Sequence, residues 1–184
     1  MARKESVTKQ DILNSAFEMA ATEGIEQVTA RKLAAHVGCS TQPIFRLYEN
    51  MSQLLQDVFF LAIDYYREYY RTFPKQSDIP FVDLGMAYIR FAQENKALFR
   101  LLFLSEERYG KSFYEILNGE EQFVLSQINA AASFGCKDPQ GMFMNMWIFI
   151  HGAASMSLTD DYDLDETQTL SLLVATYKAF QNAQ

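Results

Sequence analysis

The chain has 184 residues, of which nearly half are apolar, and its formal net charge is −7. This apolar content excludes a disordered chain, and the length allows either one unit or a small head on a larger body. No apolar run approaches the roughly 20 residues that cross a bilayer, and the polar N-terminus does not resemble a secretion signal. Cys39 and Cys136 are too few for a disulfide framework, and no Cys/His cluster indicates zinc. We therefore expect a cytoplasmic protein with no membrane partner, metal or cofactor.

The negative charge lies in the later part of the chain. Residues 1–50 hold six Lys/Arg and six Asp/Glu, whereas residues 51–184 hold ten and seventeen. Local charge decides attraction to phosphate, because salt screens charges over about 8 Å. A neutral first part with basic residues on one side is compatible with DNA. The tail before Thr8 has two interpretations, a solvated segment or an arm across DNA.

The first fifty residues predict three short helices. Residues 8–23 have apolar positions at helical spacing, and Gly24 ends that helix. Thr29 is a polar cap for a second helix, which Gly38 and Cys39 interrupt. Ser40 then begins a third helix that runs to Tyr48. Two helices joined by such a break indicate a helix-turn-helix, whose second helix fits a DNA major groove.

The polar residues of this segment are candidates for DNA contact. Gln42 has an amide that can both donate to and accept from a base edge, and Arg46 can reach guanine or phosphate. Pro43 is tolerated in the first helical turn because the N–H that it lacks has no partner there. The predicted DNA-binding residues are Thr29, Arg31, Ser40, Thr41, Gln42, Pro43, Arg46 and Tyr48.

The segment from Thr29 to Leu55, TARKLAAHVGCSTQPIFRLYENMSQLL, resembles the N-terminal domain of TetR-family transcriptional regulators. The resemblance covers about residues 8–58. It implies a DNA-binding domain over residues 1–51 and a ligand-binding and dimerisation domain over 52–184. Two positions depart from the family pattern, because Phe45 stands where a phosphate-contacting Tyr is common and Met51 where a Lys is common.

The rest of the chain predicts further helices and no strands, which makes the fold class all-α with about nine helices. Aromatic residues occur on several sides of the fourth helix, which should span both domains. Residues 105–119 look irregular. The expected helices after the third cover residues 52–73, a segment starting near 80 and ending at 94–95, 96–104, 120–134, a segment opening at 138–139, and 166–182.

Two stretches of the body resemble one TetR subgroup: the run from Tyr88 to Phe103, and Trp147 followed by His151-Gly152. His151 is four residues after Trp147 and shares its helical face, where it either packs in the core or touches a ligand. Met and aromatic side chains have the same two interpretations, core packing or the wall of an apolar cavity. Arg90 is either a solvated arginine or the anchor of a carboxylate. The candidate ligand-binding residues are Tyr65, Tyr66, Met86, Arg90, Phe103, Met146, Trp147 and His151.

The family resemblance further implies a homodimer through the last two helices. A twofold dimer places two reading helices on a palindromic operator. We therefore expect a ligand-responsive DNA-binding regulator, a repressor released by a small apolar molecule. We expect no enzyme, because no Ser or Cys has a distinct activating partner. The alternative is a helical small-molecule carrier or enzyme with a vestigial DNA-binding head.

Overall fold

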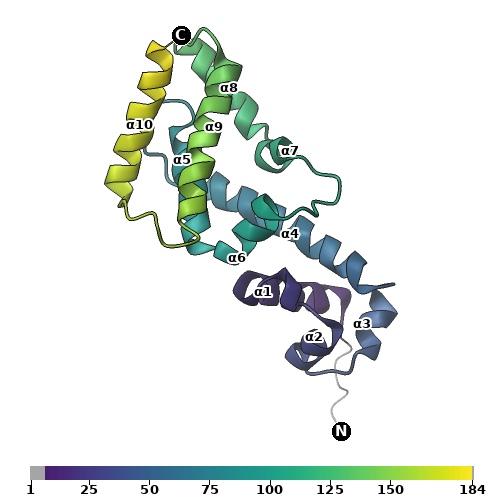
Figure 1. Ribbon diagram of the computed structural model, residues 1–184. Coiled ribbons are helices and arrows are strands. Elements are labelled where there is room, and N and C mark those ends of the chain that lie inside the picture. Colours follow the sequence, from purple (N-terminus) through teal and green to yellow (C-terminus); the bar gives the residue numbers. More distant parts are fainter. Residues whose placement is uncertain (1–6, 184) are drawn as a thin grey trace. The chain divides into compact units, whose positions relative to one another are not determined.

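The computed structural model describes residues 7–183, over which the chain is helical and has no strand (Figure 1). The predicted all-α class is confirmed. The expectation for the N-terminal arm falls on residues 1–6, outside this range. The described residues form two compact units. We call residues 7–65 with Ala97–Gly110 the head unit, and Tyr66–Lys96 with 111–183 the body unit.

The head unit is built around three short helices, and its first two have side-chain caps. Thr8 and Asp11 form a capping box at the start of α1, and Thr29 accepts a hydrogen bond from the Lys32 amide at the start of α2. Gly38 ends α2 in the left-handed region, at φ 73°, which glycine adopts without steric cost. The elements are α1 (Lys9–Glu23), η1 (Ile25–Gln27), α2 (Ala30–Val37), α3 (Gln42–Leu47) and the first part of α4 (Met51–Thr72).

These helices share one apolar core. Ile12 and Ala16 of α1, Leu33 of α2 and Ile44 of α3 are fully buried together, and Leu54 extends the core into α4. Burial of such side chains contributes roughly 1.5–3 kcal/mol each, so this core fixes how α2 and α3 lie against α1. The head unit also includes most of α6 (Lys96–Phe99) and the π-helical turn η2 (Arg100–Leu104).

The body unit is organised around α5 (Val82–Glu94), in which nine of the thirteen residues are buried. Helix α5 packs against α9 (Pro139–Met156) and α10 (Glu166–Asn182), as Figure 1 shows. Gly85 permits this close approach, because a Cβ there would lie 2.9 Å from Ile150 and 3.0 Å from Leu173. Helices α7 (Phe113–Asn118) and α8 (Phe123–Ser133) pack on each other, and α8 packs on α9.

Beyond α5, the helices differ from the expectations in three places. Helix α7 lies within residues 105–119, which we expected to be irregular. The expected single helix over 96–104 is instead α6 followed by the π-helical turn η2. Helix α8 begins three residues later than expected, because Gln122 takes a left-handed conformation at φ 55°. Among the described residues, no helix is long and apolar enough to span a membrane.

Candidate nucleic-acid interface and effector-site residues

Helix α3 presents one buried face and one exposed face. Ile44 is fully buried in the head core, and Tyr48, which ends the helix, is 1% exposed. Gln42 and Arg46 lie on the opposite face and are exposed, and Thr41, which precedes the helix, is exposed as well. The helical period of 3.6 residues separates these two sets. The polar side chains therefore project from a helix whose orientation the core determines.

The start of α3 differs from the expectation. Thr41, not Ser40, is the residue before the helix, and its side chain makes no capping hydrogen bond. Pro43 lies in the first turn, where its fixed φ favours the helical conformation without a side-chain cap. Ser40 is exposed beside the helix. A hollow of about 600 Å³ is lined by Ser40, Gln42, Pro43, Phe45 and Arg46.

Tyr48 is corrected from a DNA-contacting residue to a core residue. Its ring is buried with Ile44, and the Lys9 ammonium lies 4.6 Å from the ring centroid. Burial, together with the nearby Asp57 carboxylate, raises the pKa of Tyr48 to about 12. Lys9 also pairs with Asp57 at 3.1 Å, so its charge joins α1 to α4. A side chain held in this way packs the head and does not present a surface to a duplex.

The other predicted DNA-binding residues lie on the surface around α2 and α3. Thr29 is exposed although its hydroxyl caps α2. Arg31 is exposed in the first turn of α2, and Arg46 is exposed on α3. Within residues 7–183 neither arginine has an ion-pair partner, whereas Lys32 binds Gln27 at 2.5 Å. The head unit thus carries an exposed arginine on α2 and another on α3.

The predicted ligand residues are divided between the two units. Tyr65 is 42% exposed in the head unit, where its ring lies 5.6 Å from that of Phe17. Phe103 is buried in η2, also in the head unit, against Phe99. Arg90 is exposed and pairs with Glu94 at 2.8 Å and Glu166 at 3.2 Å. Tyr65 and Phe103 therefore belong to the head unit, whereas Arg90 belongs to the body unit, where its charge is already paired.

In the body unit, the structure brings Trp147 and His151 together in what we call the aromatic cluster. Its members are Tyr88, Phe113, Phe143, Trp147 and His151. His151 stacks on Trp147 with ring centroids 5.4 Å apart, and its Nδ1 shares a 2.9 Å hydrogen bond with the Tyr88 hydroxyl. Burial lowers the pKa of His151, so this imidazole is neutral at neutral pH.

Tyr66 packs edge-on against Tyr88, with ring centroids 6.2 Å apart, and so extends this region. Met86 on α5 and Met146 on α9 are buried. Sequence reasoning did not select Tyr88 or Phe113. Tyr88 lies three residues after Gly85 on the strongly apolar helix α5. A hydroxyl in such a helix needs a hydrogen-bond partner, and this is the signal that could have identified Tyr88.

Comparison with protein families identifies this body. Residues 81–177, more than half of the chain, match the sequence model described as the tetracyclin repressor-like C-terminal domain. The chain belongs to the TetR family. That family comprises transcriptional regulators, so the recognition made from the sequence is confirmed at family level. The match extends from the residue before α5 into α10 and leaves out α1–α4.

The fold of the whole chain also resembles a solved TetR-family structure. A crystal structure described as a TetR-family transcriptional regulator from Rhodococcus sp. aligns with a TM-score of 0.58 over 92% of this chain and 96% of that one. The two sequences are 17% identical, so this likeness shows the fold. Comparison with curated proteins finds no match. The subgroup resemblance around Trp147 and His151 stays a prediction.

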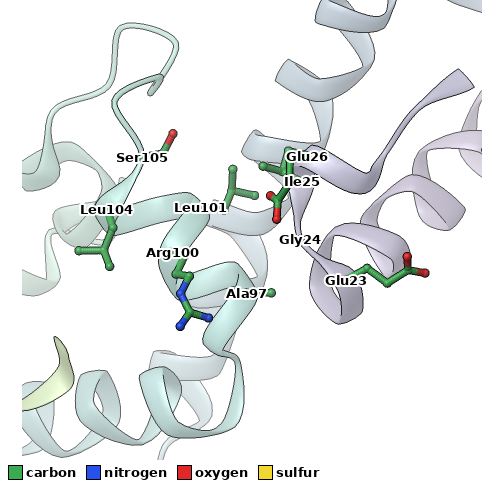
Figure 2. Close-up of a pocket in the computed structure, with 9 residues that line it drawn as sticks. All are labelled: Glu23, Gly24, Ile25, Glu26, Ala97, Arg100, Leu101, Leu104 and Ser105. Atoms are coloured by element: carbon green, nitrogen blue, oxygen red, sulfur yellow. The ribbon is translucent and has the colours of Figure 1, made fainter. Parts of the chain in front are cut away.

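This TetR-family chain has a further hollow, of about 390 Å³, within the head unit. Figure 2 shows that its walls come from the end of α1 with η1 and from α6 with η2. Apolar Ile25, Leu101 and Leu104 share these walls with the charged side chains of Glu26 and Arg100. None of the eight predicted ligand residues lines this hollow.

Proposed function

We propose that this TetR-family protein is a DNA-binding transcriptional repressor whose α3 enters the major groove of its operator. The observation that carries the proposal is the outward face of α3. Gln42 and Arg46 are exposed one helical turn apart, while buried Ile44 holds the helix from behind. The Gln amide suits adenine and the Arg guanidinium suits guanine in the major groove. Arg31 supports the proposal as a phosphate contact from α2.

A homodimer through α9 and α10 is part of this proposal. Met144, Ile148 and Met156 are 52%, 64% and 48% exposed and lie on one face of α9 at intervals of four or eight residues. Gly152 continues this face, with open space where a Cβ would stand. Apolar side chains in such a row favour burial against a second copy of the same face. A twofold dimer then presents two α3 helices to an inverted repeat.

We propose the aromatic cluster as the place where a small apolar effector acts. Tyr88, Trp147 and His151 combine apolar rings with two polar atoms that can orient a ligand. Such an effector would lower DNA affinity by binding more tightly to a conformation that does not fit the operator. Coupling of 1–3 kcal/mol, roughly the range for allosteric proteins, would weaken DNA binding about five- to 150-fold.

The proposal is tested by selecting bound duplexes from a random DNA pool with the full chain. We expect an inverted repeat to emerge. Gln42→Ala and Arg46→Ala should each weaken binding to it by about 1–3 kcal/mol and relax the base preference at one position per half-site. Arg71→Ala is the matched control, because Arg71 is an exposed arginine in the body unit.

The outcomes separate this function from its alternative. Equal binding by Gln42→Ala, Arg46→Ala and the unaltered chain would show that α3 is not the reading helix. If no sequence is selected while small apolar compounds bind the body, a ligand carrier or enzyme with a vestigial head is the better account.

A further inference from the structure

Phe45 is an aromatic residue that helix α3 leaves outside the core. Its side chain is 50% exposed. The two neighbouring residues are as expected from their chemistry, because apolar Ile44 is buried and charged Arg46 is exposed. Phe45 belongs neither to the buried head core nor to the partly buried side chains packed against it. Packing of the head therefore does not explain a phenylalanine at this position.

The surroundings of Phe45 are those of the proposed reading surface. Gln42, Pro43, Phe45 and Arg46 line one hollow with Ser40. An exposed apolar residue by itself is common on protein surfaces and needs no function. Phe45 differs because its neighbours on this face are the polar side chains that we assign to base edges. Because these side chains line the same hollow, a duplex that contacts Gln42 and Arg46 comes close to the ring of Phe45.

The chemistry of the major groove then restricts what the ring can contact favourably. Base edges in that groove present hydrogen-bond donors and acceptors, and the 5-methyl group of thymine is their apolar feature. A phenyl ring has no group that could bond a phosphate oxygen, so it cannot serve as a tyrosine hydroxyl would. Against a donor or acceptor, the ring would leave that polar group without a partner, at a cost.

We propose that Phe45 selects thymine at one position of each operator half-site by packing its ring on the 5-methyl group. This inference rests on the proposed function and adds a specificity determinant to it. Gln42 and Arg46 then supply polar recognition, and Phe45 supplies apolar recognition of a neighbouring base pair.

The test removes the methyl group and nothing else. In the selected operator, each thymine is replaced in turn by deoxyuridine, symmetrically in both half-sites, and the Kd of the full chain is measured. At one position the substitution should weaken binding about fourfold per half-site, the effect of losing one buried carbon group. Phe45→Ala should bind thymine and uracil operators equally at that position.

Phe134→Ala is the matched control, because Phe134, the residue that follows α8 in the body unit, is a phenylalanine of nearly the same exposure, 49%. It should retain the full preference for thymine. If Phe45→Ala binds too weakly to measure, Phe45→Leu should show a preference between that of the unaltered chain and none.

Two results would overturn the inference while leaving DNA binding intact: no deoxyuridine position weakens binding, or Phe45→Ala and Phe45→Leu keep the full preference for thymine. Failure to select any operator would instead overturn the proposed function on which the inference rests.

Discussion

His151 is a residue whose protonation is altered by its place in the fold. Burial against Trp147 lowers its pKa below the ordinary value of 6.5. Between that value and the lowered one, the unfolded chain binds a proton that the folded chain does not. The neutral imidazole therefore contributes stability above about pH 6.5, and this contribution is lost as the pH falls through the lowered pKa.

The lowered pKa of His151 predicts how the unfolding free energy changes with pH. Urea unfolding of the unaltered chain and of His151→Gln is compared at pH 7.5 and 5.5. The loss of unfolding free energy on acidification should be smaller in His151→Gln, because glutamine does not titrate. All other ionisable groups are the same in the two proteins, so their contributions cancel in the comparison. An equal loss in the two proteins would contradict the buried, neutral state of His151.

The limits of prediction at residue level have a physical origin. Gln42 and Arg46 were predicted to be exposed and are, because helical spacing alone separates them from Ile44. Tyr48 was assigned to DNA, yet it is buried in a core to which residues of α1, α2 and α4 also contribute. A local pattern contains no information about such partners.

Among the helices, α9 carries the exposed apolar face that we propose for the homodimer. Ile148 is 64% exposed in the single chain, so aspartate there should fold with little penalty. At the proposed dimer face, however, each copy would bury an unpaired carboxylate. We expect Ile148→Asp to weaken dimerisation on the order of 100-fold or more in sedimentation measurements. The control is Leu125→Asp, at a 37% exposed site on α8, which should remain a dimer like the unaltered chain. If Ile148→Asp dimerises as tightly as the unaltered chain, the dimer face lies elsewhere.

Helices with caps and a regular apolar stripe in their own sequence were the most predictable elements. Helix α10 has the predicted bounds because Asp165 and Gln168 cap its start and its apolar stripe is regular. Helix α7 was missed although Ser112 and Glu115 have the same capping-box spacing, since glycines on both sides suggested a loop. The π-helical turn η2 could not be foreseen, because the consecutive apolar residues Leu101 to Leu104 have no distinct period.

For the molecule as a whole, the compact units do not follow the chain order. Helix α4 contributes its first part to the head unit and its end to the body unit, and Ala97–Gly110 belong to the head unit although body residues precede and follow them. Such membership depends on contacts between distant residues, which no single segment reveals. The functional boundary at residue 51 stays a prediction, since it concerns which residues touch DNA.

The central claim is that α3 lies in the major groove, and methylation interference on the selected operator tests it most directly. Methyl groups on guanine N7 project into the major groove, and those on adenine N3 into the minor groove. We predict that guanine-N7 methylation blocks binding at symmetric positions in the two half-sites and that Arg46→Ala loses this sensitivity. Interference confined to adenine N3, or none at any guanine of the half-sites, would contradict the account.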